Sequence, residues 1–293
     1  MKRYLNYTIP QHATPVTIDA FVRSHGFTSS IIKNLKQTNN GVMVNQTWKH
    51  FWELLNPGDH LIITIDDQKI SENIVPSNLP LTIHYEDEDI LVINKDWDCP
   101  IHPSQNNYSN TLANAVQYYY QQQEEAFTFR CINRLDRDTT GLTVIAKHYF
   151  SAAKLSLSMK NRLIKRTYLA LVEGITPLSG TIDLPVGRVE GSTIERCIDF
   201  AAGEQAITHY QRLAIKNGHS LISLNLETGR THQIRVHMKA IGHPLLGDGI
   251  YNQEDQSLPR QALHSYQLTF PHPVTGILCQ FMQPLPIDME GLL

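Results

Sequence analysis

The chain enters an apolar strand through the segment Asn133-Arg134-Leu135-Asp136-Arg137-Asp138-Thr139-Thr140-Gly141-Leu142. A loop directly before a strand can hold a side chain at the rim of a sheet, where pockets form. The residues alone allow two interpretations. The segment is either a turn whose carboxylates pair with Arg134 and Arg137, or a functional site built around Asp136. Since paired charges are common in turns, the rest of the chain has to decide between them.

Outward from this segment, strand patterns outnumber helical patterns and mostly follow one another directly. The expected strands span 81–85, 90–94, 142–147, 167–173, 207–215, 221–227 and 262–270. The expected helices span 111–121, 148–160 and 231–241. This order predicts an α+β fold with a mixed, largely antiparallel sheet over residues 82–293.

A smaller unit is expected over residues 1–75, joined to the rest by a linker at 76–81. Thr17 can cap one helix of this unit, and Ser29 or Ser30 can cap a second helix. Two short strands are expected, at 42–44 and 60–65. The linker is identified by two prolines and by the absence of hydrophobic periodicity.

Composition limits the class of protein. No apolar run reaches membrane-spanning length, and the start of the chain lacks the apolar stretch of a signal peptide, so we expect a cytoplasmic protein. The four cysteines are widely spaced without a CxxC pair, which favours reduced thiols. Cys99 and His102 have no second pair at ligand spacing, so no metal site is expected.

Charge is unevenly distributed along the chain. The formal net charge of −3 does not by itself favour nucleic acid. Between Arg130 and Arg166, however, nine basic residues accompany only two acids, Asp136 and Asp138. Such a run is compatible both with an ordinary solvated face and with an RNA-binding surface.

The segment around Asp136 resembles the signature of the RluA family of RNA pseudouridine synthases. That signature reads His-Arg-Leu-Asp, two variable residues, then Thr-Ser-Gly-Leu, and six of its positions agree with residues 133–142. The resemblance implies that Asp136 is the catalytic aspartate. It also implies that Arg134 enters the space that the flipped base leaves.

Two further motifs occur in the order that the family has. Residues 164–174 resemble the second motif, whose tyrosine contacts the target base and corresponds to Tyr168. Residues 226–237 resemble the third motif, whose arginine pairs with the catalytic aspartate and corresponds to Arg235. The closing segments of the family also agree, at 244–248 and 263–264. The resemblance therefore covers residues 82–293 and implies the pseudouridine synthase fold.

The implied roles agree with the chemistry of the reaction. A reacting aspartate has to stay ionised in a pocket, and a paired arginine stabilises and orients it. A stacked uridine has to be flipped out before it can react, and Arg134 would offset part of that cost. Tyr168 offers a ring face on which the uracil can stack. No cofactor is required, because the product is an isomer of the substrate. The sequence leaves open whether Asp136 attacks the ribose or abstracts its proton.

The expected partner is RNA, either ribosomal or transfer RNA, bound by a monomer without a membrane. The residues expected to contact it are all basic: Arg134, Arg137, Lys165, Arg166, Arg230, Lys33 and Lys36. Residues 1–75 resemble the small RNA-binding domain shared with small-subunit ribosomal protein four, on 18–22, 41–45 and 57–59. A docking or folding domain is the alternative for this unit. We expect structural roles for three histidines, His232, His237 and His243.

The chain departs from the family pattern at a few positions. Asn133 replaces a histidine, Asp96 and Asp98 replace a proline and a glycine, and Arg166 stands where lysine is common. Because an amide can still form local hydrogen bonds, Asn133 is expected to change loop packing without removing the chemistry. The competing class is a non-catalytic RNA-binding or ribosome-assembly factor with the same fold. That class predicts a broken catalytic set, whereas the four implied residues are all present.

Overall fold

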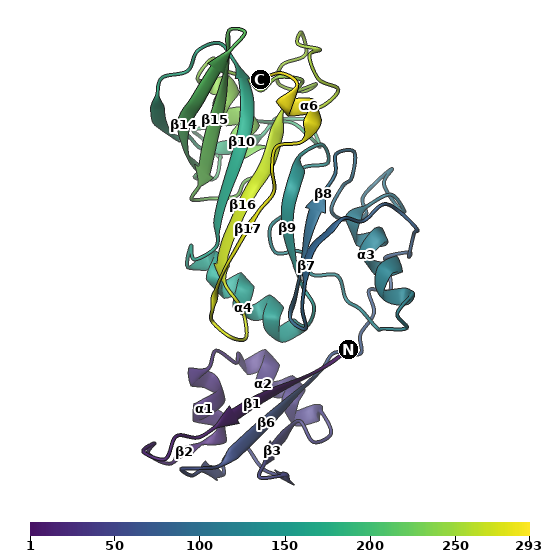
Figure 1. The fold of residues 1–293 in the computed structure, drawn as a ribbon, viewed down its shortest axis with the longest axis vertical. Coiled ribbons are helices and arrows are strands. Elements are labelled where there is room, and N and C mark those ends of the chain that lie inside the picture. The colour runs from purple at the N-terminus through teal and green to yellow at the C-terminus, as the bar shows by residue number, and fades with distance from the viewer.

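The computed structural model describes residues 1–293 and consists of two units stacked along the long axis of the molecule (Figure 1). The smaller unit contains a four-stranded sheet and the larger unit a nine-stranded sheet, with helices packed on both. This architecture confirms the expected α+β class. None of the six helices combines the length and the apolar character that a membrane crossing requires.

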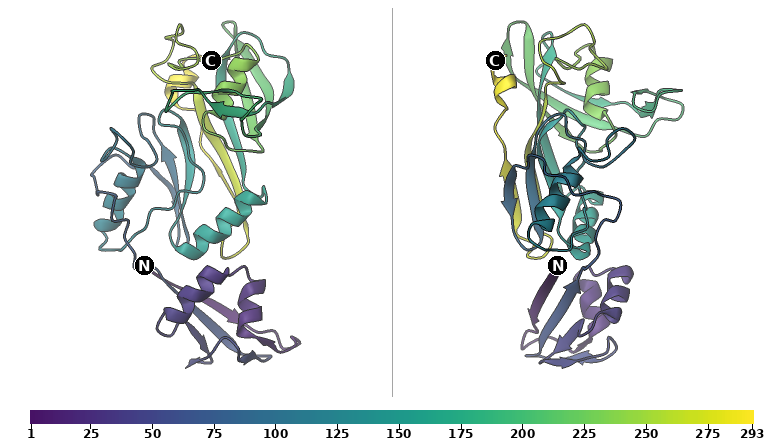
Figure 2. Two further views of the ribbon diagram at one scale, coloured as in Figure 1. Left: turned by 180° about the vertical axis from the view of Figure 1, so that it is seen from behind. Right: turned by 90° about the vertical axis from the view of Figure 1, so that its right-hand side faces the viewer.

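The N-terminal unit is an antiparallel sheet with two helices on one face, in the strand order β1-β6-β3-β4 (Figure 2). Its strands are β1 (Lys2–Thr8), β3 (Val42–Val44), β4 (Thr47–Trp48) and β6 (His60–Asp66), with a ribbon of β2 (Val16–Thr17) and β5 (Leu54–Leu55). Its helices are α1 (Ile18–Ser24) and α2 (Ser29–Gln37). A cluster of fifteen buried apolar side chains forms the core of this unit.

Two details of this unit differ from the expectation. The cap of α2 is Thr28, whose hydroxyl accepts a hydrogen bond from the Ile31 N–H at 3.4 Å, so the expected cap at Ser29 or Ser30 was wrong. Thr28 has an extended backbone, as a capping residue requires, while both serines are already helical. Strand β1 was not expected. Its burial alternates, with Arg3, Leu5 and Tyr7 inward, but only Leu5 is fully buried, and the charged Arg3 on the inward face hides the apolar alternation in the sequence.

The larger sheet runs in the order β11-β14-β15-β10-β16-β9-β8-β7, with β17 paired to β16. All its pairings are antiparallel except β9 with β16, which confirms the expected mixed, largely antiparallel sheet. The expected strands correspond to β7 (Ile83–Glu86), β8 (Ile90–Lys95), β9 (Thr140–Ala146), β10 (Lys165–Glu173), β14 (Ile207–Lys216), β15 (His219–Leu226) and β16 (Leu263–Pro271). The strands that were not expected are β11 (Ser179–Asp183), β12 (Val186–Arg188), β13 (Arg196–Ile198) and β17 (Leu278–Met282).

Helices cover both faces of the sheet around β8. The helices of this unit are α3 (Leu112–Gln121), α4 (Tyr149–Lys160), α5 (Gln233–Ala240) and α6 (Ile287–Glu290). Leu91 and Ile93 pack in one cluster with α3, while Ile90 and Val92 pack in another with α4. Because successive strand residues point to opposite faces, β8 is apolar without interruption.

The two units are joined by a buried seam. Phe150 of α4 belongs to the core of the N-terminal unit, with its ring centroid 4.4 Å from that of Phe27. Arg3 of β1 forms an ion pair with Asp89 of the larger unit at 2.9 Å. Figure 1 shows α4 at the end of the large sheet that faces the N-terminal unit. The N-terminal unit is therefore packed against the larger one and not merely tethered to it.

The segment 67–82 between β6 and β7, which includes the expected linker at 76–81, contains neither helix nor strand, but it is attached to the larger unit. The Ser71 N–H donates to the Phe127 carbonyl at 3.3 Å, and the Ser77 N–H donates to the Asn114 carbonyl at 3.2 Å. The Asn114 side chain donates in turn to the Val75 carbonyl at 2.7 Å. These contacts hold the segment along the start of α3, and the domain boundaries at 75 and 81 stay a prediction.

Candidate active site

The Asp136 loop enters the sheet at its parallel pair of strands. β9 and β16 pair only at Thr140 with His264 and at Gly141 with Ser265. Gly141 has φ +102°, and a Cβ atom there would lie 2.3 Å from the Ser265 carbonyl oxygen. Only glycine permits this close approach of the two strands. The loop before β9 therefore lies where the two halves of the sheet meet.

Asn133 attaches the start of the loop to β9. Its side-chain N–H donates to the Leu142 carbonyl at 3.1 Å, and its side-chain oxygen accepts from the Val144 N–H at 2.8 Å. Asn133 is 2% exposed, so these bonds satisfy an amide that would otherwise be buried without partners. The residue that replaces the family histidine thus forms local hydrogen bonds, as expected.

Lys95 anchors the other side of the loop. Its ammonium group donates to the Arg137 carbonyl at 2.8 Å and to the Asp96 carbonyl at 2.7 Å. The side chain is 1% exposed, and burial lowers the pKa of Lys95 to about 8. The Asp136 loop is thus tied to β9 through Asn133 and to the end of β8 through Lys95.

Asp136 contacts an arginine that is already engaged elsewhere. Arg235 of α5 places Nη1 3.3 Å from Oδ2 of Asp136. The same guanidinium grips Asp248 with two hydrogen bonds, at 2.7 Å from Nε and 2.8 Å from Nη2. The Asp136 side chain keeps 24% of its surface exposed, whereas Asp248 has none and Arg235 has 5%. Asp248 therefore fixes the guanidinium, and Asp136 is the carboxylate that remains open to a substrate.

The protonation of this pair follows from its geometry. Burial acts to lower the pKa of Arg235, but the hydrogen bonds and charge of Asp248, together with Asp136, raise it above its usual value. Burial acts to raise the pKa of Asp248, but the hydrogen bonds and charge of Arg235 lower it by more. The net pKa of Asp248 is therefore below its ordinary range. Arg235 and Asp248 thus stay charged at neutral pH.

His232 forms a second contact to Asp136 and is itself held by Tyr251. His232 precedes α5 with the left-handed φ of 57°, and its Nε2 lies 4.0 Å from Oδ2 of Asp136. Its Nδ1 lies 2.9 Å from the Tyr251 hydroxyl, which accepts the Arg196 N–H at 2.8 Å. The hydroxyl proton of Tyr251 can therefore go to Nδ1, which leaves the His232 proton on Nε2, facing Asp136. Burial lowers the pKa of His232, which favours the neutral ring.

Tyr168 lies on β10 in the same region. It is 5% exposed and packs in a cluster with Leu135 of the loop and Ile234 of α5. Burial raises the pKa of Tyr168, so the hydroxyl is neutral. The cluster joins the loop, the strand and the helix that carry Asp136, Tyr168 and Arg235, and the three residues predicted as catalytic come together here.

The two arginines of the loop are not equivalent. Arg134 is exposed and forms no hydrogen bond or ion pair within the chain. Arg137 forms ion pairs with Asp138 at 3.1 Å and with Asp98 at 3.7 Å. Arg134 is thus the loop arginine that is free to contact RNA, while Arg137 would have to leave its carboxylate partners.

The other residues predicted to bind RNA lie away from Asp136. Lys165 and Arg166 line a separate hollow of about 390 Å³ between the end of α4 and the adjoining ends of β10 and β15. Arg230 forms an ion pair with Glu204 at 2.6 Å. Lys33 and Lys36 are exposed on α2 of the N-terminal unit. The structure therefore does not gather these five residues into one site.

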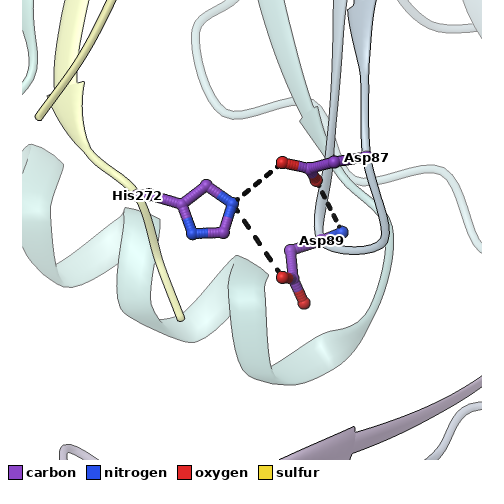
Figure 3. A group of neighbouring side chains, drawn as sticks. All are labelled: Asp87, Asp89 and His272. Atoms are coloured by element: carbon purple, nitrogen blue, oxygen red, sulfur yellow. Dashed lines mark hydrogen bonds and ion pairs between the residues drawn. The ribbon is translucent and has the colours of Figure 1, made fainter. Parts of the chain in front are cut away.

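A different group of acids and a histidine has the proximity of a metal site, at Asp87, Asp89 and His272 (Figure 3). Its ligand atoms all lie within 4.8 Å of one another. Each Asp87 oxygen already accepts two hydrogen bonds, and Asp89 accepts from Arg3 and from His148. Since donors occupy the oxygens and a guanidinium lies beside them, the geometry is that of an ion-pair cluster in the seam.

Asp248, His232 and Tyr251 were not predicted as site residues. Asp248 was quoted as part of a closing segment without a role, and His232 was grouped with two histidines as structural. His237 does fit that description, since its ring nitrogens contact the Thr208 hydroxyl and the Leu184 carbonyl at 2.9 Å each. The position of His232 inside the arginine motif, three residues before Arg235, was the one available signal that it differs.

Comparison with known proteins identifies the family. The family model for RNA pseudouridylate synthase matches residues 89–240. The RNA pseudouridine synthase YjbO of Bacillus subtilis is 38% identical over 279 residues, which is 95% of this chain and 98% of the relative. Ribosomal large subunit pseudouridine synthase D of Pasteurella multocida is 41% identical over 246 residues, or 79% of this chain and 75% of the relative.

Solved structures are similar in the same way. The human protein RNA pseudouridylate synthase domain containing 1 superposes with a TM-score of 0.59 at 30% identity, over 71% of this chain and 84% of that one. Its human counterpart, domain containing 4, gives a TM-score of 0.57 at 22% identity, over 71% of this chain and 90% of that one, and supports the fold. The chain belongs to the RNA pseudouridylate synthase family and is an RNA pseudouridine synthase, an isomerase that acts on uridine in RNA.

Proposed function

We propose that this chain converts uridine to pseudouridine with Asp136 as the reacting carboxylate. The observation that supports this most is the half-open state of Asp136, whose Oδ2 contacts Arg235 at 3.3 Å while part of the carboxylate faces solvent. A carboxylate that is oriented but not saturated with donors can approach a ribose. His232 Nε2 lies 4.0 Å from the carboxylate, and Tyr168 packs against Leu135 of the loop that carries it.

In the proposed reaction no atom is added or lost overall. The bond between the anomeric carbon and N1 of uracil breaks, the uracil turns, and its C5 forms a bond to the anomeric carbon. The proton that leaves C5 is balanced by one that N1 takes up. Asp136 either attacks the ribose or abstracts its proton, and both routes need the carboxylate to be ionised.

Arg235 would position Asp136 without neutralising it. Asp248 binds two of the nitrogens of Arg235, so the guanidinium shares its positive charge between two carboxylates. Asp136 is thereby held in place by one nitrogen and keeps more of its negative charge than an exclusive pair would allow. His232 would add a second fixed direction through its Nε2.

Arg134 would act on the RNA and not on the reacting bond. A uridine must leave its stack to reach Asp136, and the gap destabilises the helix. Arg134 is exposed, unpaired and two residues from Asp136, so it can enter that gap. The remaining predicted contacts, Lys165 and Arg166 in the separate hollow and Arg230, would bind phosphates of the RNA away from Asp136.

We propose large-subunit ribosomal RNA as the substrate and transfer RNA as the less favoured one. The support is the 41% identity to a relative whose name assigns it to that RNA, together with an N-terminal unit over 1–75 that resembles a ribosomal RNA-binding domain. In this division 76–81 is the linker, 82–293 is the catalytic domain, and the enzyme acts as a monomer.

The test is a pseudouridine map of cellular RNA from strains with the wild-type gene, with a deletion, and with Asp136→Asn. Loss of the same few sites from large-subunit ribosomal RNA in both mutants is the expected result. Loss confined to transfer RNA would reject the substrate but keep the enzyme. An unchanged map together with a ribosome-assembly defect would favour the non-catalytic factor.

A further inference from the structure

The N-terminal unit displays a row of exposed aromatic side chains that the proposed function does not use. From Trp48 to Leu55 outward and inward residues alternate, and the outward positions are Trp48, His50, Trp52 and Leu54. Trp48 is 50% exposed and Trp52 is 71% exposed. Tryptophan is a large apolar residue that is highly buried on average, so two of them exposed on the same side of one segment indicate a binding surface.

The three rings are arranged as a ladder, which we define as Trp48, His50 and Trp52. The His50 and Trp52 ring centroids are 5.2 Å apart with an interplanar angle of 14°. Trp48 meets His50 edge-on, at 4.3 Å and 72°. The outer face of Trp52 has no aromatic partner, so a further flat ring could continue the stack there.

The inward residues hold the ladder rigid. The Asp19 N–H of α1 donates to the Phe51 carbonyl at 2.8 Å, and the Ile18 N–H donates to the Glu53 carbonyl at 2.9 Å. Glu53 also accepts the Lys49 ammonium and the His50 N–H, each at 2.7 Å. A ligand would therefore meet rings that are already in place, with little ordering required.

Basic residues of α2 border the segment that carries the ladder and indicate a negatively charged occupant. The Lys36 ammonium lies 5.2 Å from the ring centroid of Phe51, the inward residue between His50 and Trp52, so it borders this segment on the side away from the exposed rings. Lys33 lies on the same helix, neither lysine forms an ion pair, and α2 contains no acidic residue. Aromatic rings next to unpaired cations are the arrangement that binds single-stranded nucleic acid.

We propose that the ladder is a stacking platform for unpaired bases of the RNA substrate, with Lys33 and Lys36 on the adjoining phosphates. The inference rests on the RNA activity of the family and extends it to a second site. The seam at Phe150 and Arg3 fixes the platform relative to Asp136, so the platform would bind a part of the RNA remote from the target uridine. Stacking on every base would add affinity without selecting a sequence.

Tryptophan fluorescence tests the platform directly. The chain has three tryptophans, so Trp97→Phe leaves only Trp48 and Trp52 to report. The probe is a twelve-nucleotide oligoadenylate, which has no uracil to enter the catalytic pocket, titrated against an abasic oligomer with the same phosphates. We expect quenching by oligoadenylate and little quenching by the abasic oligomer. Equal effects from both probes would show that no base stacks there and would overturn the proposal.

Substitutions of Trp52 test whether its aromatic ring contributes to binding. Trp52→Ala should weaken oligoadenylate binding about tenfold, and Trp52→Phe should recover most of it, because stacking on a ring contributes of this order per base. Tyr4→Ala removes another half-exposed ring of the same unit and serves as the matched control, with unchanged affinity expected. An unchanged affinity of Trp52→Ala would contradict the platform.

Two further outcomes distinguish the alternatives. Self-association that rises with protein concentration and disappears in Trp52→Ala would assign the ladder to a second copy of the chain. The titrations do not depend on turnover, so Asp136→Asn should show the same quenching as the wild-type chain. A wild-type chain that shows quenching but forms no pseudouridine would reject the catalytic proposal and keep this one. A melting curve of each variant checks that the exposed substitution leaves the fold intact.

Discussion

Two aspartates in this molecule each form an ion pair with an arginine, Asp89 in the seam and Asp136 in the active site. They differ in how many hydrogen-bond donors each carboxylate has and in how much of it is exposed. In the seam, Asp89 is 4% exposed and accepts from Arg3 at 2.9 Å and from His148 at 2.8 Å. In the active site, Asp136 is 24% exposed and has one arginine contact, at 3.3 Å. The seam aspartate is thus saturated with donors, and the active-site aspartate is not.

The difference separates a structural acid from a reactive one. Burial acts to raise the pKa of Asp89, but hydrogen bonds from His148 and Arg3 lower it more, and the net pKa falls below the ordinary range. A carboxylate whose oxygens all accept hydrogen bonds is a poor nucleophile. The same bonds let Asp89 stabilise the contact between the two units. Asp136 owes its open side to Asp248, which binds Arg235 more completely.

The largest expected effect compares the two aspartates directly. Asp136→Asn should lower the single-turnover rate by about a thousandfold or more, because it removes the reacting charge, and should leave RNA affinity within several-fold. Asp89→Asn should leave the rate unchanged and lower the melting temperature. Rates come from rapid-quench assays and stabilities from calorimetry. Retention of a tenth of the wild-type rate in Asp136→Asn would reject the assignment.

Arg235→Ala should affect both stability and rate. It leaves Asp248 buried without its partner, which destabilises by about 3–5 kcal/mol, and the rate should fall about a hundredfold because Asp136 loses its orientation. The double variant with Asp248→Asn removes the unpaired charge and should recover stability but not rate. Recovery of the rate in the double variant would show that Arg235 acts only on the fold.

The effect of Arg134→Ala on activity should depend on the structure of the RNA. We expect the loss of pseudouridine formation to be about tenfold greater on a stem-loop than on an unstructured oligonucleotide that contains the same uridine. The reason is that only in the stem-loop does the uridine have to leave a base stack. The matched control is Arg137→Ala, which removes a neighbouring arginine that is already paired with Asp138. Equal losses on both RNAs would identify Arg134 as a phosphate contact.

The last expected effect is on the stability of the seam. Arg3→Ala should destabilise by about 2 kcal/mol at pH 7, since His148 still pairs with Asp89. Because the pKa of Asp89 is lowered in the folded chain, its contribution is complete above the unfolded value of about 3.9 and disappears as the pH falls through the lower, folded value. The stability difference between variant and wild type should therefore shrink in acid. A constant difference down to pH 2 would contradict the charged pairing.

Sequence reasoning identified the parts of the fold that have a local signal. The buried runs of β8 and β9 and the Thr17 cap are read from neighbouring residues, and the Asp136 and Arg235 motifs come from resemblance. Asp248 was missed because it meets Arg235 through a turn with no periodic pattern. The pair of Arg3 and Asp89 lies 86 residues apart along the chain, and no spacing rule predicts such a contact between two units.

The most direct test of the central claim is to measure product and proton release together. An RNA labelled with tritium at C5 of its uridines is incubated with the wild-type chain and with Asp136→Asn, and the digested nucleosides are separated by chromatography. The account predicts one tritium released for each pseudouridine formed by the wild-type chain, and neither signal from Asp136→Asn. Pseudouridine formation by Asp136→Asn at the wild-type rate would contradict the role of this carboxylate.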